Sequence, residues 1–232
     1  MSVRYVSSLS TRLLKYNKPR GVLSTTLPTK DGVNILQASG ETLSIFFPKA
    51  TDANFVVPIG RLDKESHGLL LLTTEKSISG ALLRSTINHS GSSFTKEYLV
   101  QTKRQVSDQQ LELLRNGIEI SISKKSGANA KVLTKKCIVD RWPIVSNLGH
   151  PPSVEDTASS AEHPNNTLRF ILREGKNRQL RKMIGSLGHV VLDIQRTAFG
   201  NIQLGSLRSG EMSWLSDEEL KDIMTVLNRQ QR

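Results

Sequence analysis

Several charged side chains stand directly before one of the most apolar runs of the chain. The segment PIGRLDKESHGLLLLTTE, which begins at Pro58, places Arg61, Asp63 and His67 ahead of four consecutive leucines. An apolar run of this length, closed by two threonines, predicts a short buried strand. A carboxylate at the mouth of such a strand is either a turn residue or a reactive group that a rigid element holds in place. The glycines on either side of this group let the backbone turn tightly around it.

A second dense group of polar residues lies in REGKNRQLRKM. Its cations are Arg173, Lys176, Arg178, Arg181 and Lys182. They surround the expected start of a helix, where free backbone N–H groups favour the binding of a phosphate. A solvated basic helix face would explain the same charges without a ligand.

Short strands and a few helices must position these two groups. Strands are predicted for RLLKY, NFVVPIG, LLLL, SFTKEYLVQTK, GIEISIS, KKCIVD and TLRFILREG, and two more for HVVLDIQRTAFGNIQLGSL. Helices are predicted for EKSISGALLRSTI, DQQLELLRNG, KNRQLRKMIGSLG and DEELKDIMTVLN, with caps at Ser107 and Ser216. Many strands with hairpin-like connections favour an α+β fold with a largely antiparallel sheet.

The charge balance indicates the kind of partner. The 232 residues include 32 Lys and Arg against 21 Asp and Glu, a net charge of +11. This excess favours nucleic acid, because each phosphate that is neutralised releases a counterion. A basic organellar protein would show the same excess. Only 5% of residues are aromatic, which argues against an extended base-stacking platform, and no apolar run reaches the length of a membrane helix.

Cysteine and histidine patterns exclude several kinds of site. The single Cys137 excludes an internal disulfide and a cysteine-based zinc site, and its strand-like surroundings indicate a small core residue. The five histidines show no metal-ligand spacing. Ser66 and His67 suggest a hydrolase, but KESHG does not match G-x-S-x-G and no acid is placed to complete a triad.

Two segments lack the periodicity of helices and strands. Residues 1–12 are rich in Ser and Arg, which suits either an organellar targeting segment or a basic RNA-contacting tail. Residues 147–166, NLGHPPSVEDTASSAEHPNN, carry Pro, Ser, Asn and Gly throughout, which predicts a surface insertion. The chain from 13 to 228 is expected to form the domain that carries both polar groups.

Three sequence motifs occur in order along the chain, namely GRLDKESHGLLLLT, KEYLV and EGKNRQLRKM. Together they closely resemble the pseudouridine synthases of the ribosomal small-subunit synthase A family, whose signature is G-R-L-D-x-x-S-x-G-L-L. The resemblance runs from about Lys15 to Leu215. The segment RWPIVSNLGHPP before the third motif makes the chain most similar to the large-subunit synthases of the E type. Those proteins lack the separate S4 RNA-binding domain of many relatives.

The resemblance implies a fold and a reaction. The implied fold is α+β, with a bent mixed, largely antiparallel sheet in two subdomains flanking a catalytic cleft. Residues 13–228 would form this catalytic domain, with no S4 domain. The implied reaction converts a uridine of RNA to pseudouridine: the N-glycosidic bond breaks, the uracil turns, and C5 rejoins the ribose. It needs no cofactor and no metal.

The resemblance also assigns roles to individual residues. Asp63 matches the family's aspartate nucleophile, which attacks the base or the ribose C1′ and can leave again. Tyr98 in KEYLV matches the tyrosine that stacks on the flipped base, and Lys176 matches the cation that keeps Asp63 ionised. The other candidates are expected to bind RNA or to support the site, and they are Arg61, His67, Arg173, Asn177, Arg178, Gln179, Leu180 and Arg181.

The expected substrate is ribosomal RNA, most simply that of the large subunit or its assembly particle, and we expect a monomer that does not bind membranes. Two alternatives stay open: a synthase that acts on tRNA, and a non-catalytic RNA-binding or ribosome-assembly factor on the same fold. Asp63, Tyr98 and Lys176 together favour the enzyme, because a pure binder needs no such set. The expected location is the bacterial cytoplasm, or a mitochondrion or plastid if residues 1–12 are a targeting segment.

Overall fold

The computed structural model describes five stretches of the chain, residues 13–46, 56–85, 94–123, 129–142 and 166–229. They form two compact units. The first unit combines the part of the chain before Thr95 with the part after Gln195, and the second unit is the segment between them. The expected N-terminal tail and nearly all of the expected insertion lie outside the described residues.

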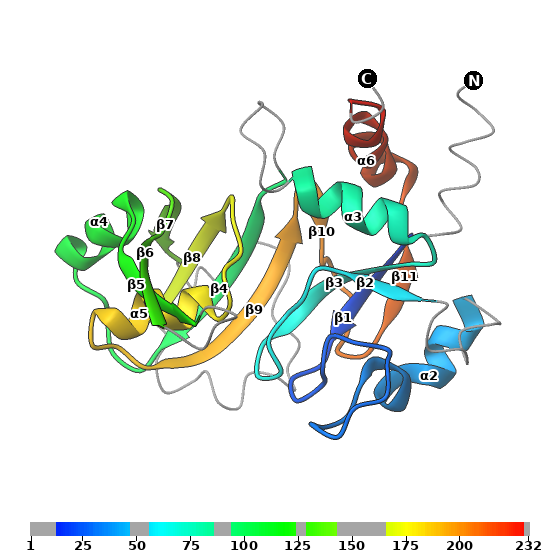
Figure 1. The fold of residues 1–232 in the computed structure, drawn as a ribbon, viewed down its shortest axis with the longest axis horizontal. Helices are drawn as coiled ribbons and strands as arrows, with labels where there is room; N and C mark the ends of the chain where they lie inside the picture. Colours follow the sequence, from blue (N-terminus) through cyan, green and yellow to red (C-terminus); the bar gives the residue numbers. More distant parts are fainter. Residues whose placement is uncertain (1–12, 47–55, 86–93, 124–128, 143–165, 230–232) are drawn as a thin grey trace. The chain divides into compact units, whose positions relative to one another are not determined.

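The sheet of the first unit has the strand order β11-β1-β3-β9 (Figure 1). Its centre is the antiparallel pair of β1 (Leu13–Lys18) and β3 (His67–Thr73), in which Lys18 lies opposite Gly68. Both faces of β3 are buried, which explains its uninterrupted apolar run. The Asp63 loop therefore leads directly into the most deeply buried strand of this unit.

Three short strands complete this sheet. β11 (Met212–Trp214) pairs with β1, and β2 (Val57–Ile59) pairs with β3, both antiparallel. β9 (Val191–Phe199) enters the first unit at Arg196 and pairs with β10 (Ile202–Gln203). Both ends of the chain thus contribute strands to one sheet.

Helices pack on both faces of β1 and β3. α3 (Lys76–Ser85) and α6 (Asp217–Arg229) contribute their apolar faces to a core that includes Leu69 and Leu71. Toward the other face, the hydroxyl groups of Tyr16 and Ser39 lie 2.8 Å apart and link β1 to α2 (Ile35–Phe46). The expected packing of the last helix on the sheet is confirmed.

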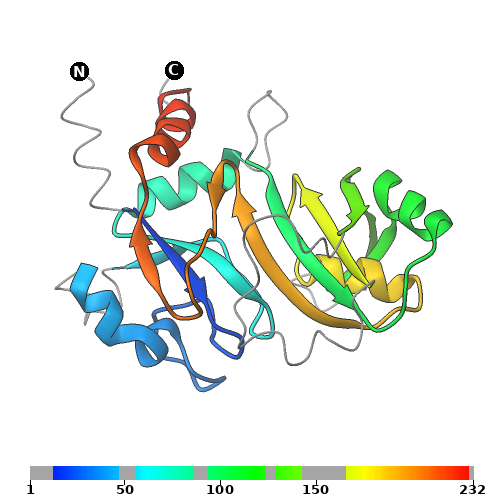
Figure 2. The ribbon, with the colours of Figure 1, turned by 180° about the vertical axis from the view of Figure 1, so that it is seen from behind.

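The second unit has the strand order β9-β4-β8-β7, with the separate antiparallel pair of β5 (Glu119–Ser123) and β6 (Asn129–Leu133). β4 (Lys96–Thr102) and β7 (Ile138–Arg141) lie antiparallel on either side of β8 (Thr167–Leu172) (Figures 1 and 2). Apolar side chains of α4 (Asp108–Asn116) and α5 (Gln179–Ser186) share one core with β4 and β8.

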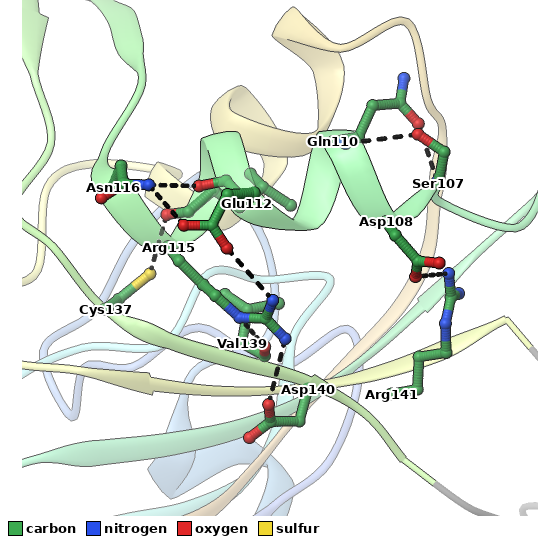
Figure 3. Close-up of polar contacts among 11 residues, drawn as sticks. Ser107, Asp108, Gln110, Glu112, Arg115, Asn116, Cys137, Val139, Asp140 and Arg141 are labelled. Atoms are coloured by element: carbon green, nitrogen blue, oxygen red, sulfur yellow. Dashed lines mark hydrogen bonds and ion pairs between the residues drawn. The ribbon is translucent and has the colours of Figure 1, made fainter.

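Polar contacts fix α4 in this unit (Figure 3). The Ser107 hydroxyl accepts the backbone N–H of Gln110 at 3.3 Å, and the Gln110 side chain accepts the N–H of Ser107 at 3.0 Å, which completes the predicted cap as a capping box. Near the other end, Arg115 donates to the carbonyl of Val139 at 2.9 Å and pairs with Asp140 at 3.3 Å. These contacts hold the helix against β7.

Cys137 packs beside the core of the second unit, as expected from its surroundings in the sequence. Its thiol donates to the carbonyl of Leu114 at 3.2 Å (Figure 3). Burial raises the pKa of Cys137 to about 11, and the Glu174 carboxylate adds to that increase. The thiol therefore stays protonated near neutral pH and is a poor nucleophile.

The α+β class and the largely antiparallel sheet are confirmed. The structure adds two strands that the sequence pattern did not predict: β6, which is half exposed, and β11, which has only three residues. α5 begins at Gln179, later than its pattern predicted, because Lys176 to Arg178 form a loop. In the described part of the chain, no helix is long and apolar enough to cross a membrane.

Candidate active site

Asp63 lies in the short loop between β2 and β3 and is half-buried. Arg61 is exposed, and His67 is the half-buried first residue of β3. The buried Ser66 donates its backbone N–H to the carbonyl of Asp63 at 3.1 Å, which closes a turn around the carboxylate. Arg61 and Asp63 thus share this loop, Asp63 is partly exposed, and His67 begins the strand that follows.

A buried cation accompanies this carboxylate within the first unit. Lys18, at the end of β1, is fully buried, and its ammonium donates to the carbonyls of Pro19 at 2.8 Å and Val22 at 2.7 Å. Burial and the charge of Arg196 lower the pKa of Lys18 to about 8, against the opposing pull of Asp63 and Glu65. The charge of Lys18 thus interacts with the carboxylates of Asp63 and Glu65 within the first unit.

Arg196 is the second buried cation of this region, with 2% of its surface exposed. Its Nε donates to the carbonyl of Leu69 at 2.6 Å, and its guanidinium lies 6.0 Å from the ring centre of Phe199. The Arg196 backbone also explains Gly68, which has φ +98°: a Cβ there would lie 2.4 Å from the Arg196 carbonyl O. Only glycine fits this close approach of two strands.

The sequence patterns did not identify Lys18 and Arg196 as parts of the candidate site. Lys18 ends a predicted strand in NKPRG, and Arg196 stands inside another in DIQRT. A long cation within a strand pattern was the available signal, because it must either reach water or find carbonyl partners. Here each of them binds backbone carbonyls.

Tyr98 belongs to β4 of the second unit, opposite Phe170 of β8. Its ring is half-buried and packs against the core to which Leu180 of α5 contributes. Leu180 itself is buried. Tyr98 and Leu180 therefore contribute to one core of the second unit.

Glu174 is the hub of the loop before α5. Its buried carboxylate forms an ion pair with the Lys176 ammonium and accepts the side-chain amide of Gln179 at 2.7 Å and the backbone N–H of Lys135 at 2.9 Å. The Gln179 carbonyl oxygen in turn accepts the backbone N–H of Lys176 at 2.9 Å. Burial alone would raise the pKa of Glu174, but these hydrogen bonds and the Lys176 charge outweigh it and lower the pKa.

The remaining predicted residues divide by exposure. Arg173, Asn177 and Arg178 are exposed, and Arg181 is half-buried on α5. Arg178 adopts the left-handed conformation, with φ +51°, directly before α5, a conformation that side chains other than glycine rarely take. Gln179 is buried and bonded to Glu174, so it supports the loop and does not offer its amide to a ligand.

Among the described residues, no group of three or more His, Cys, Asp or Glu lies together so that it could hold a metal ion. The chemical groups on hand are a half-buried carboxylate with a buried cation in the first unit, and a tyrosine and an ion-paired lysine in the second. A carboxylate of this kind can act as a nucleophile that leaves again.

The sequence model of the RNA pseudouridylate synthase family matches residues 12–186, which include Asp63, Tyr98 and Lys176. The chain belongs to this family. The family resemblance drawn from the three sequence motifs is thereby confirmed.

Individual relatives of this pseudouridine synthase family member cover most of its length. The dual-specificity RNA pseudouridine synthase RluF of Salmonella typhi is 30% identical over 217 residues, or 93% of this chain and 58% of the relative. The ribosomal large subunit pseudouridine synthase E of Vibrio parahaemolyticus is 29% identical over 200 residues, or 86% of this chain and 72% of the relative. The chain therefore spans less than two thirds of the RluF relatives.

A solved structure supports the fold of this family member. The crystal structure of a pseudouridylate synthase matches it with a TM-score of 0.65 at 22% identity, over 91% of this chain and 73% of that chain. The chain therefore has the fold of that pseudouridylate synthase, in keeping with the α+β class described above.

Proposed function

We propose that this protein isomerises a uridine of ribosomal RNA to pseudouridine, with large-subunit RNA as the substrate and Asp63 as the nucleophile. The observation that carries the proposal is a partly exposed aspartate on a fixed loop, whose charge acts on a buried lysine, in a member of the RNA pseudouridylate synthase family. The similarity to a large-subunit synthase supports the choice of RNA. The net charge of +11 supports binding to a polyanion.

The proposed reaction requires no oxidation or reduction. The Asp63 carboxylate attacks the base or the ribose C1′, and the bond between N1 and C1′ breaks. The freed uracil turns, C5 bonds to C1′ and the bond to the Asp63 carboxylate breaks. The proton on C5 leaves to solvent while N1 gains one. The half-buried ring of Tyr98 offers an aromatic face on which the flipped base stacks.

Lys176 is the cation that the family resemblance assigns to Asp63, and its ion pair with Glu174 compensates its charge within the second unit. Arg181, on the first turn of α5, is the other candidate for the cation that accompanies Asp63. Lys176→Met and Arg181→Met separate the two. The variant that loses more of the rate at saturating enzyme, with an unchanged Kd for RNA, identifies the partner of the nucleophile.

Tritium release tests the reaction directly. Large-subunit rRNA transcript labelled with [5-³H]uridine is incubated with the wild type, Asp63→Asn and Asp63→Ala. We expect release with the wild type and none with either variant, because isomerisation expels the C5 hydrogen. Transcripts of tRNA are assayed in parallel, because tRNA is the alternative substrate.

The competing function is a non-catalytic RNA-binding or assembly factor. It predicts RNA binding without tritium release from rRNA, tRNA or native particles, and an Asp63→Ala variant that alters binding alone. Release from tRNA only would keep the enzyme and replace the proposed substrate.

A further inference from the structure

A serine of the first unit holds the backbone of the residue directly before Asp63. The Ser24 hydroxyl donates to the carbonyl of Leu62 at 2.8 Å and accepts the backbone N–H of the same residue at 3.0 Å. Ser24 is 8% exposed, so water does not compete freely for these bonds. Buried backbone groups outside a strand need such partners, and here one hydroxyl serves both groups of Leu62.

The residue directly after Asp63 is held from the same stretch of chain. The backbone N–H of Gly21 donates to the carbonyl of Lys64 at 2.8 Å. The Lys64 ammonium reaches the carbonyl of Asp31 at 3.2 Å. Asp63 is therefore the single residue between two anchored neighbours, and both anchors come from the segment that follows β1.

This segment is itself fixed. The N–H of Leu23 donates to the carbonyl of Val33 at 2.9 Å, and the N–H of Ile35 donates to the carbonyl of Thr25 at 2.9 Å. Lys18 adds its bond to the carbonyl of Val22 at 2.7 Å. Ser24 thus connects the Asp63 loop to a segment that is itself held by hydrogen bonds.

We propose that Ser24 is a positioning residue for the Asp63 nucleophile. The inference rests on the proposed function, in which the Asp63 carboxylate must meet a flipped uridine in one geometry. Displacing a reacting group by about 1 Å can cost roughly 100-fold in rate. Without the Ser24 hydroxyl, both backbone groups of Leu62 lose their partner and the loop gains freedom, while the RNA-binding surface keeps its side chains.

Thr26 provides a matched control two residues along the same segment. It is 3% exposed, and its hydroxyl donates to the carbonyl of Val56 at 2.8 Å. Thr26→Val removes a buried hydroxyl that is bonded to backbone, as Ser24→Ala does. The two variants differ in which loop loses its anchor.

The test compares the wild type with Ser24→Ala, Ser24→Cys and Thr26→Val. Three quantities are measured: Tm, Kd for the rRNA transcript, and the single-turnover rate of tritium release at saturating enzyme. We expect similar losses in Tm for Ser24→Ala and Thr26→Val and a Kd within twofold of wild type for all. The rate should fall roughly 10- to 100-fold for Ser24→Ala and less than threefold for Thr26→Val.

Ser24→Cys keeps the shape of the side chain but offers only a weak donor and acceptor. It should fold even if Ser24→Ala does not, with a rate between those of wild type and Ser24→Ala. Equal rates for the Ser24 variants and Thr26→Val would overturn the positioning role. A wild type without activity would instead overturn the proposed function. Hydrogen exchange would then test whether Ser24 holds the Asp63 loop.

Amide hydrogen exchange provides a readout that does not depend on activity. Ser24→Ala should raise exchange at the N–H of Leu62, whereas Thr26→Val should leave it unchanged. Unchanged protection of Leu62 in Ser24→Ala would show that the hydroxyl does not hold the loop.

Discussion

The Asp63 loop of the first unit and the Glu174 loop of the second each carry a carboxylate beside a lysine, but they use the carboxylate differently. In the first loop, neutral groups of Ser24 and Gly21 bind the backbone on both sides of Asp63. In the second, the carboxylate of Glu174 itself accepts bonds from Gln179, Lys135 and Lys176. Asp63 is therefore held in place through its backbone, whereas the carboxylate of Glu174 holds its neighbours in place.

This difference agrees with the proposal that Asp63 is the reactive acid and Glu174 a structural one. A carboxylate whose lone pairs are occupied by three donors has little capacity left to attack a substrate. A half-buried carboxylate on a loop that is fixed through its backbone keeps its oxygens available.

Breaking the support of the first loop should have the largest effect on stability. In Gly68→Ala the new Cβ would meet the Arg196 backbone at 2.4 Å, at a φ of +98°. We expect a loss of about 3 kcal/mol or more in the free energy of unfolding, because backbone cannot move aside as a flexible side chain can. Urea unfolding followed by circular dichroism measures it.

Gly40→Ala in α2 serves as the control for this substitution. Nothing lies within 4 Å of its Cβ position, so alanine should leave stability unchanged or raise it by up to about 1 kcal/mol. Equal stability of the two variants would show that β3 and β9 can separate without cost.

Removing the charge of Glu174 should break the second loop. Glu174→Gln leaves the Lys176 ammonium without its ion pair and presents an amide to groups that donate. We expect a loss of about 1–3 kcal/mol near pH 7 in urea unfolding. Because the pKa of Glu174 is lowered in the fold, this difference should shrink as the pH falls below about 4.5.

Glu112→Gln is the matched control. Its carboxylate lies in an ion pair with Arg115 at 3.4 Å, and its side chain is 63% exposed. We expect a change under about 0.5 kcal/mol. A loss equal to that of Glu174→Gln would contradict the hub role of Glu174.

The titration of Lys18, in the first unit, should make the free energy of unfolding depend on pH. The folded pKa is about 8 against 10.5 for the unperturbed group, so between these values the unfolded chain binds more protons. Stability should therefore rise with pH in this window, by about 2 kcal/mol between pH 7.5 and 10. Lys18→Met should lack this rise, which urea unfolding at both pH values would detect. A parallel rise in both proteins would assign it to other groups.

The smallest expected effects concern the two capping boxes, one in each unit. Ser107→Ala at α4 and Ser216→Ala at α6 each remove a hydroxyl that accepts a backbone N–H at 3.3 Å. Each should cost about 1 kcal/mol in urea unfolding. A much larger loss for one of them would show that its cap supports more than its own helix.

Local patterns predicted much of this molecule. The apolar run of β3, the capping residues Ser107 and Ser216, and the strand around Tyr98 were readable because each depends on neighbours within one helix or strand. The motif around Asp63 was recognisable for the same reason, since its residues share one short loop.

The supports of the site were not readable in this way. Ser24 and Leu62 are 38 residues apart, and Arg196 and Leu69 are 127 residues apart. No periodic pattern encodes such a pairing, because it depends on how strands are ordered in the finished sheet. Gln179 was expected at a helix N-terminus among RNA-binding cations, but its amide is buried against Glu174, a partner that the charge pattern did not single out.

The division of the chain sets the order in which the protein is completed during translation. The second unit, Thr95–Gln195, is one continuous segment and leaves the ribosome before the last strands of the first unit. The first unit has to wait, because Leu14 of β1 pairs with Trp214 of β11, and Trp214 is synthesised after the whole second unit. The Asp63 loop is thus made early but gains its complete support late, so a nascent chain that stops before β11 should remain inactive.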